Sequence, residues 1–205
     1  MIGIIDYGMG NLGSVANALD YLGLEAEIVD DPGRLGAHDR LILPGVGSFS
    51  MAMRSLDASG WSDALRQKAA DGIPLLGICL GMQLILDVGE EHGTPAGLGL
   101  VPGRVVPLNP ASPFRVPHVG WNGLSYPRRH PLFEGVKEHV DIYFVHSYQC
   151  VPALEETVLA RCDYGGEFVA AVGKANVLGV QFHPEKSQDM GLKILENFAK
   201  WDGSC

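Results

Sequence analysis

A cysteine lies between two glycines in the stretch Gly77-Ile78-Cys79-Leu80-Gly81, where two apolar patterns meet. The apolar run over 73–78 predicts a buried strand, and the apolar residues that follow recur at helical spacing as far as Val88. A strand, a tight turn and a helix would place Cys79 at the carboxyl end of the strand, as in a nucleophile elbow. The amides and dipole of the helix would favour its thiolate. The alternative is a buried structural cysteine, a common state of this residue.

A histidine and a glutamate far along the chain could complete this chemistry, because a thiolate needs a base and a group that orients the base. In Gln181-Phe182-His183-Pro184-Glu185 the histidine follows the apolar run 177–182, so it also lies at a strand end. The proline between His183 and Glu185 restricts how the two side chains meet. A lone His-Pro pair could be an exposed turn. Together with the cysteine elbow, it predicts a Cys79-His183-Glu185 triad.

Acyl transfer to a thiolate also requires donors for the oxyanion of the tetrahedral intermediate. The backbone amide of Leu80, directly after the cysteine, is one candidate. The turn Pro44-Gly45-Val46-Gly47 ends another predicted strand, and the amide of Val46 could be the second donor. A plain strand-to-helix turn remains an equally open interpretation of this stretch.

The chain up to Gly89 alternates between strand and helix patterns. The predicted strands are 2–5, 25–29, 40–43 and 73–78, and the predicted helices are a segment begun by Asn11 or Ser14, then 49–56 and 61–70. Such alternation is typical of a parallel sheet with helices on both faces.

The pattern changes after Gly89. Glycine and proline are dense over 93–117, and the later apolar runs have little helix between them. They predict strands at 140–145, 157–162, 168–172 and 177–182, followed by a helix at 190–201. An antiparallel extension fits these runs better than further crossovers. The sequence therefore predicts one α/β domain over 1–205, with an open, mostly parallel sheet flanked by helices and an antiparallel extension.

The composition is that of an ordinary globular protein, and a net charge of −9 without a basic stripe argues against a nucleic-acid surface. The four cysteines, Cys79, Cys150, Cys162 and Cys205, form neither a disulfide framework nor a zinc pattern, which favours a reducing cytoplasm. The last three have no chemical context and are interpreted as structural or incidental. We find no membrane span and no signal-peptide pattern, so we expect a cytoplasmic protein. We also expect no metal and no cofactor.

A glycine pattern near the N-terminus offers a competing function. Gly8-X-Gly10-X-X-Gly13 follows the first predicted strand, and Asp30 or Asp31 lies near the distance expected for a ribose ligand, as in dinucleotide-binding proteins. The pattern is weak on its own. In the other interpretation, the glycines form a turn that presents Asn11 to a partner.

The motifs around Cys79 and His183 resemble those of the class I, or triad, glutamine amidotransferases, which release ammonia from glutamine. The chain is most similar to the branch that serves imidazole glycerol phosphate synthesis in histidine biosynthesis. The segments that carry this closer resemblance extend nearly from end to end: Asp6-Tyr7-Gly8-Met9-Gly10-Asn11-Leu12, Leu43-Pro44-Gly45-Val46-Gly47, Gly97-Leu98-Gly99-Leu100-Val101-Pro102-Gly103, His118-Val119-Gly120-Trp121-Asn122, Tyr143-Phe144-Val145-His146-Ser147-Tyr148 and His183-Pro184-Glu185-Lys186-Ser187.

The resemblance implies that Cys79 forms a γ-glutamyl thioester, with His183 as acid and base and Glu185 as its orienting group. It implies a glutamine pocket made by Gly45, Gln83, Glu91, Ser147 and Tyr148. Without the resemblance, Glu91 would be an ordinary exposed charge, and Ser147 and Tyr148 ordinary strand residues. One departure is Gly89, where many relatives carry serine before the paired glutamates, so the loop that holds Glu91 is less well matched.

The resemblance also implies a partner, a (β/α)8-barrel cyclase subunit that forms a heterodimer with this chain and receives the ammonia in its interior. Family positions near that interface correspond to Asn11, Trp121, Tyr143 and Lys186. As isolated residues, Asn11 and Lys186 would be solvated surface and Trp121 core. We hypothesise that docking of the barrel rearranges the Val46 backbone and completes the oxyanion hole, because Val46 lies between two glycines. A related amidotransferase subunit that serves another barrel, such as one that amidates a surface sugar, is the alternative.

Overall fold

The computed structural model describes residues 1–204, in which twelve strands form one mixed sheet. Its first half is parallel, in the spatial order β2 (Ala26–Val29), β1 (Ile2–Ile5), β3 (Arg40–Gly45), β4 (Leu75–Cys79) and β12 (Val177–Val180). The predicted parallel sheet is confirmed. The strands β1, β3, β4 and β12 carry short apolar runs, as strands buried on both faces do, while the edge strand β2 is largely exposed.

The second half of the sheet is antiparallel and continues from β12. The order is β11 (Glu167–Lys174), β10 (Val158–Asp163), β7 (His118–Ser125) and β8 (Asp141–His146). β9 (Tyr148–Pro152) pairs with β11 and with β6 (Gly103–Pro107), which pairs with β5 (Val88–Gly89). The predicted antiparallel extension is confirmed, although the sequence pattern did not predict β6, β7 or β9.

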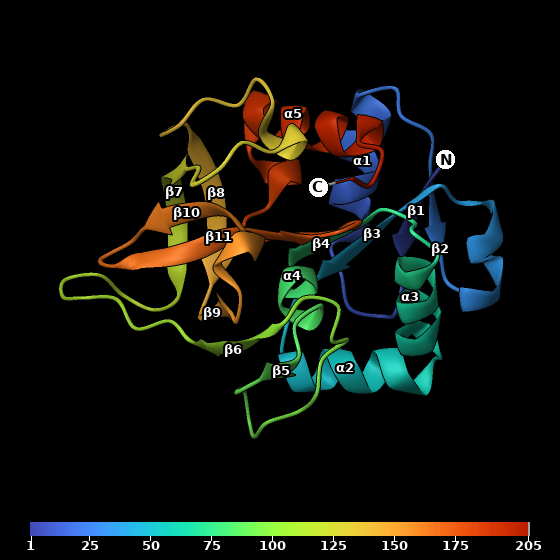
Figure 1. Cartoon of the computed structure of the whole chain (residues 1–205), viewed down its shortest axis with the longest axis horizontal. Coiled ribbons are helices and arrows are strands. Elements are labelled where there is room, and N and C mark those ends of the chain that lie inside the picture. The colour runs from blue at the N-terminus through green and yellow to red at the C-terminus, as the bar shows by residue number, and fades with distance from the viewer. Residues whose placement is uncertain (205) are drawn as a thin grey trace.

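Helices cover both faces of the parallel half (Figure 1). α1 (Leu12–Tyr21) and α5 (Gln188–Lys200) lie on one face, and α2 (Phe49–Ala58) and α3 (Trp61–Ala70) lie on the other. Alternation along the strands makes the two cores: Ile4 and Leu76 join the cluster under α1 and α5, while Ile5 and Leu75 join the cluster under α2 and α3. Short 3₁₀ turns lie at Pro32–Ala37, Pro131–Phe133, Glu155–Thr157 and Pro184–Lys186.

One local prediction is wrong. The helix after Cys79, α4 (Leu80–Leu84), is only five residues long, and Val88 belongs to β5. The carbonyls that would continue the helix are taken instead by a returning loop, since Leu98 donates to Leu84 and Leu100 donates to Ile85. At the start of α1, Asn11 is the N-cap residue, one of the two positions predicted, but its side chain makes no capping hydrogen bond.

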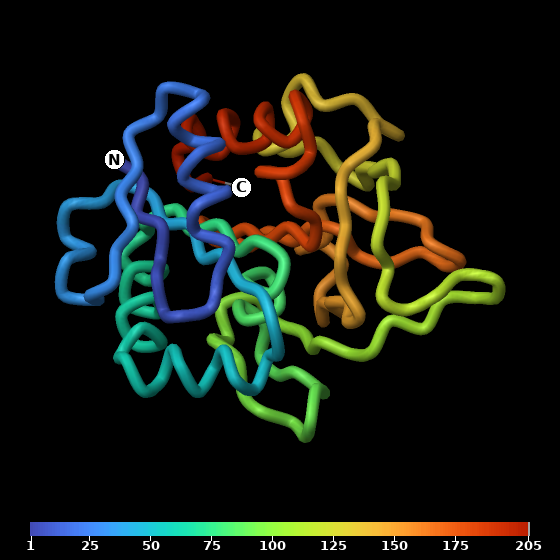
Figure 2. The backbone as a smooth tube through the Cα atoms, turned by 180° about the vertical axis from the view of Figure 1, so that it is seen from behind, coloured from blue at the N-terminus to red at the C-terminus, as the bar shows by residue number. Residues whose placement is uncertain are grey.

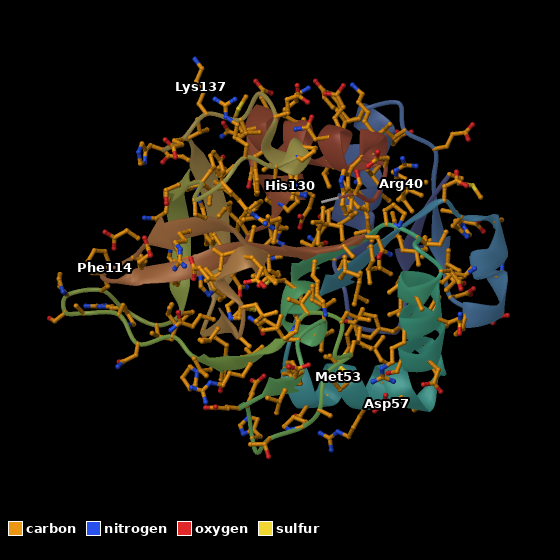
Figure 3. All side chains as sticks on the ribbon, in the orientation of Figure 1. Arg40, Met53, Asp57, Phe114, His130 and Lys137 are labelled. Carbon is orange, nitrogen blue, oxygen red and sulfur yellow. The ribbon has the colours of Figure 1, made fainter. Side chains whose placement is uncertain are left out.

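The connection between β6 and β7 extends away from the body of the molecule (Figure 2). Phe114 lies on this extension, while Met53 of α2 and His130 mark the two opposite sides of the sheet (Figure 3). Among residues 1–204, no helix is long and apolar enough to cross a membrane.

Candidate active site

Three neighbouring parallel strands end at the same edge of the sheet. Gly45 of β3 pairs with Cys79 of β4, and Val180 of β12 pairs with Ile78. The chain that leaves β12 therefore passes beside Cys79, two residues before it reaches His183. The carboxyl ends of parallel strands are the usual place for a site in such sheets.

The backbone at Cys79 forms a sharp elbow. Cys79 has a φ of 55°, a strained angle for a residue with a side chain. A β-carbon on Gly77 would lie 2.5 Å from the carbonyl oxygen of Gly81, and a β-carbon on Gly81 would collide with the carbonyl oxygen of Leu43. Both glycines are therefore required by close backbone contact, which confirms the elbow predicted from the sequence.

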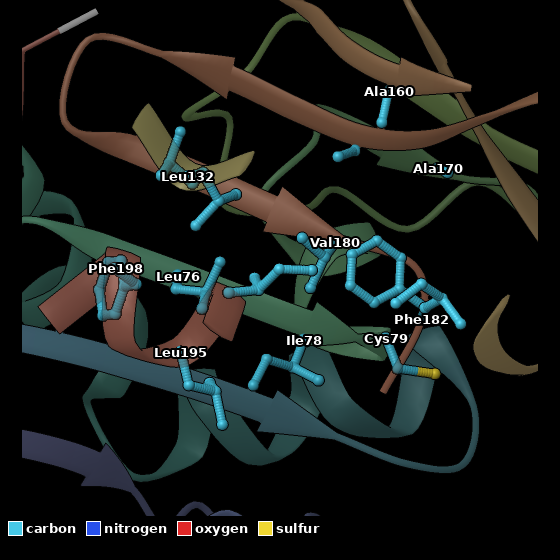
Figure 4. Close-up of a cluster of buried hydrophobic side chains, with 14 of the residues drawn as sticks. Leu76, Ile78, Cys79, Leu132, Ala160, Ala170, Val180, Phe182, Leu195 and Phe198 are labelled. Atoms are coloured by element: carbon cyan, nitrogen blue, oxygen red, sulfur yellow. The ribbon is translucent and has the colours of Figure 1, made fainter. Parts of the chain in front are cut away.

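The thiol of Cys79 is at the border of the apolar core. Its sulfur points away from the packed side chains of Ile78 and Phe182 (Figure 4), and the residue is 7% exposed. The Val145 carbonyl oxygen and the Gln181 side-chain amide each lie 3.8 Å from Sγ. Its surroundings are thus polar on one side and apolar on the other.

His183 and Glu185 form a buried pair next to this thiol. The Nδ1 of His183 is 2.8 Å from Oε1 of Glu185, and the two side chains are 3% and 1% exposed. Nε2 is buried and makes no hydrogen bond of ordinary geometry among the described residues. Burial alone would lower the pKa of His183, but interactions with Cys79 and Glu185 outweigh it and raise that pKa from 6.5 to about 9. An imidazole held in this way can accept and return a proton.

A cavity of about 320 Å³ opens over the thiol. It brings together most of the residues expected to bind or react with a substrate, and its lining consists of Val46, Gly47, Cys79, Leu80, Gln83, Glu91, Pro117, Val145, His146, Ser147, Tyr148 and His183. Glu185 lies behind His183. Gly45 does not line the cavity, and its role is close packing, since a β-carbon there would lie 2.7 Å from the Tyr7 hydroxyl.

The chain is similar to known proteins over almost all of its length. The class-I glutamine amidotransferase profile matches residues 3–201. The chain belongs to the class I glutamine amidotransferases. It is 52% identical over 199 residues to the imidazole glycerol phosphate synthase subunit HisH of Moorella thermoacetica, covering 97% of this chain and 94% of that one. It is 48% identical over 204 residues to the HisH subunit of Sulfurimonas denitrificans, covering 98% of each chain.

Solved structures share the fold of this amidotransferase. A crystal structure of a glutamine amidotransferase superposes with a TM-score of 0.75 at 24% identity, over 96% of this chain and 98% of that one. PurLQS from Thermotoga maritima gives a TM-score of 0.76 at 22% identity, over 97% of both chains. At these identities the structural similarity supports the fold class. The substrate has to be inferred from the residues of the site.

The surroundings of Cys79 include one residue that the sequence prediction left out. Gln181 is fully buried, donates toward the Cys79 sulfur and accepts a hydrogen bond from Nε2 of Gln83 at 3.0 Å. It is the residue that follows β12 beside the elbow. The strand register could have indicated it, because a residue directly after a parallel strand reaches the same edge as Cys79.

Glu91 has a second role in the amidotransferase. Its Oε2 accepts a hydrogen bond from the backbone amide of Phe49 at 2.6 Å, which satisfies a free amide at the start of α2. The same side chain lines the cavity. The loop that carries Glu91 is therefore fixed to the scaffold by the residue expected to meet the substrate ammonium.

The residues expected at the partner interface lie next to the triad. The Trp121 and Tyr143 ring centroids are 5.5 Å apart, Nζ of Lys186 is 5.9 Å from the Tyr143 centroid, and the Tyr143 and His183 centroids are 6.4 Å apart. Trp121 is 43% exposed, so it is a surface residue and not part of the core. Asn11 lies at the end of the loop that connects the carboxyl end of β1 to α1. We call Trp121, Tyr143 and Lys186 the aromatic surface.

The dinucleotide interpretation is wrong for this amidotransferase. In a dinucleotide site the third glycine of the motif allows the helix to pack closely on the strand. A β-carbon on Gly13 would meet nothing within 4 Å. Gly8, with a φ of 86°, does form the turn that the second interpretation requires before Asn11.

The other described cysteines are inert. Cys150 and Cys162 are buried, and burial raises the pKa of each thiol, that of Cys162 to about 12. Both therefore stay protonated, as the structural interpretation expects. Cys205 lies outside the described residues.

Proposed function

We propose that this chain hydrolyses L-glutamine to glutamate and ammonia with Cys79, His183 and Glu185, and passes the ammonia to a (β/α)8-barrel cyclase subunit for imidazole glycerol phosphate synthesis. The observation that carries the proposal is the geometry around Cys79. A cysteine on a strained elbow shares one cavity with an imidazole, whose other nitrogen is fixed by a buried carboxylate.

The chemistry divides into two transfers of an acyl group. The Cys79 thiolate attacks the γ-carbonyl carbon of glutamine and forms a carbon–sulfur bond. His183 gives its proton to the leaving nitrogen as the carbon–nitrogen bond breaks, which releases ammonia and leaves a γ-glutamyl thioester. Water then loses a proton to His183 and attacks the thioester. The carbon–sulfur bond breaks, and glutamate and the free thiolate remain.

Each pocket residue has a role that follows from its chemistry. The carboxylate of Glu91 suits the substrate ammonium, and Gln83, Ser147 and Tyr148 offer polar groups for the rest of the amino acid. The amides of Leu80 and Val46 would hold the oxyanion. Because Gln181 already donates toward the sulfur, it would help to hold the thiolate in place.

A partner is required because ammonia released into water would be protonated and lost as a nucleophile. The aromatic surface supports a docking site at this point, since it is exposed and leads directly to His183. A tryptophan, a tyrosine and a cation over an aromatic ring are typical of binding surfaces. The proposal treats the chain as one domain, with its two apolar clusters on the two faces of one sheet, and places it in the cytoplasm.

Co-purification with the barrel cyclase encoded in the same genome, followed by glutaminase assays with and without the cyclase nucleotide, tests the proposal. We expect a stable complex whose glutaminase activity rises when the nucleotide is bound. The Cys79→Ala variant should lose glutamine-dependent synthesis and keep ammonia-dependent synthesis, because the cyclase reaction takes place in the partner.

Two results would overturn the proposal. Glutamine-dependent synthesis retained by Cys79→Ala would exclude the nucleophile. A complex formed only with a different barrel, such as one that amidates a sugar, would exclude the histidine pathway while leaving the glutaminase chemistry intact.

A further inference from the structure

The bend that carries Ser147 into the cavity is closed by a histidine. Ser147 lies between β8 and β9, and both of its neighbours line the cavity. Nδ1 of His146 is 2.8 Å from the carbonyl oxygen of Tyr148, so the imidazole spans the bend. The same carbonyl accepts a weaker hydrogen bond from Gln83 at 3.4 Å. The position of Ser147 therefore depends on how the His146 ring is held.

The His146 ring is held by a second, fully buried histidine. His118 of β7 lies directly opposite His146 of β8, and its Nδ1 is 2.9 Å from Nε2 of His146. The His118 ring is stacked on Tyr164, with centroids 3.8 Å apart, and on Phe144, with centroids 5.0 Å apart. Its plane is fixed by packing, so it offers its nitrogens in set directions. At its outer end, Nε2 of His118 lies 2.8 Å from Oδ1 of the Asn122 side chain.

The protons in this chain can be assigned by elimination. A carbonyl oxygen only accepts, so Nδ1 of His146 carries a hydrogen, and Nε2 of a neutral His146 accepts from Nδ1 of His118. Burial lowers the pKa of both histidines, that of His146 to about 4, so both are neutral. Nε2 of His118 then needs a donor. In the structure Oδ1 of Asn122 faces this nitrogen, and Nδ2 of Asn122 donates to the Asp163 carbonyl oxygen at 3.4 Å. Exchanging the two amide atoms supplies the donor to His118 and gives up the bond to Asp163.

We infer that His118 and Asn122 are positioning residues for the glutamine pocket, which hold His146 in the tautomer that clamps the Ser147 bend. The donors run in one direction, from Asn122 through His118 and His146 to the Tyr148 carbonyl. This inference rests on the proposed function for the role of Ser147. The relay begins at Asn122, which follows Trp121 of the aromatic surface in β7. It therefore connects the strand that carries Trp121 to the substrate cavity.

His118→Leu tests the relay in the complex with the cyclase, because leucine fills much of the space and cannot donate. We expect the KM for glutamine to rise roughly tenfold, as for loss of one buried hydrogen bond, with a smaller change in kcat. His118→Asn is the matched variant, since its amide nitrogen lies near the former Nδ1 and can still donate to His146. It should recover part of the loss.

Nitrogen NMR of the histidine rings in the full chain tests the relay without an activity assay. We expect His146 with a protonated Nδ1 and a bare Nε2 in the wild type. Asn122→Asp replaces the terminal donor by an acceptor, so His118 should become protonated on both nitrogens at neutral pH.

The outcomes separate this inference from the proposed function. A wild-type His146 with its proton on Nε2, or equal KM values for wild type and His118→Leu, would overturn the relay. A wild-type complex without glutaminase activity would overturn the proposed function, and the ring spectra would still decide the relay. If His118→Leu fails to fold, the spectra of Asn122→Asp carry the test, and an unchanged His118 there would overturn the relay.

Discussion

The Cys79 elbow and the Val46 turn end neighbouring strands, and they are built in different ways. Cys79 is 7% exposed, and its backbone is enclosed by the close contacts of Gly77 and Gly81. Val46 is 44% exposed and is followed by Gly47 at a φ of 96°. The proposed nucleophile is therefore fixed by packing within this chain. The proposed second oxyanion donor, the Val46 amide, lies on a more exposed segment.

This difference suggests how activity depends on the partner. A fixed elbow holds the Cys79 side chain in one position, and an open turn can change its backbone when a surface docks against it. We propose that barrel docking moves the Val46 amide into place and so couples glutamine hydrolysis to the presence of an acceptor. Variants in the two turns should then lose glutaminase activity for different reasons.

The largest effect is expected for Gly81→Ala. Its β-carbon would collide with the Leu43 carbonyl, a backbone atom that cannot move without disturbing β3. We expect a loss of roughly 3 kcal/mol or more in the free energy of unfolding, together with loss of glutaminase activity. Denaturant unfolding measures it. Gly13→Ala in α1 is the control, since nothing lies within 4 Å and alanine favours the helix by about 0.5–1 kcal/mol. Equal effects of the two changes would contradict the packing argument.

A smaller effect, confined to chemistry, is expected for Glu185→Gln. The change removes the charge that stabilises the His183 imidazolium and nearly preserves the shape. We expect kcat to fall about 10²–10⁴-fold with little change in KM, measured as glutaminase activity of the complex. A kcat within a factor of two of the wild type would remove Glu185 from the triad.

Val46→Pro removes the proposed oxyanion donor from the open turn. We expect the partner-stimulated rate to fall about 10²–10³-fold, since that is the effect of removing one oxyanion donor. Val46→Ala keeps the amide and, at an exposed position, should change the free energy of unfolding by less than about 0.5 kcal/mol. If Val46→Pro retains full stimulation by the partner, the Val46 amide is not a donor.

A further prediction concerns the titration of His183. Because its pKa is raised from 6.5 to about 9, the folded state gains on the order of 3 kcal/mol below pH 6.5 and loses it as the pH rises through about 9. NMR titration of the ring should give a midpoint near 9, and a lower midpoint in Cys79→Ala, where only Glu185 opposes burial. A wild-type midpoint at or below 6.5 would contradict the Cys79-His183 interaction.

The parallel half of the fold could be predicted because its strands are short apolar runs between clear helical periods. The antiparallel half was harder, since β6 lies in a stretch rich in glycine and proline, where turns outweigh strand patterns. The length of α4 depends on the bonds from Leu98 and Leu100, which come from a distant loop. The helical spacing of apolar residues does not reveal such bonds.

The same limit applies to the site. Cys79 and the His183-Glu185 pair could be predicted because each follows an apolar run with a short, distinctive motif. Gln181 was missed because its role depends on register with Cys79 across two strands. The contact of His118 with His146 also crosses strands, and the two residues are 28 positions apart, so the sequence does not reveal it.

The most direct test of the account is to trap the thioester. The complex is incubated with glutamine, quenched with acid and digested, and the cysteine peptides are analysed by mass spectrometry. We predict a γ-glutamyl adduct on Cys79 and none on Cys150 or Cys162, whose thiols are buried and protonated. An active complex without an adduct on Cys79, or with the adduct on another cysteine, would contradict the central claim.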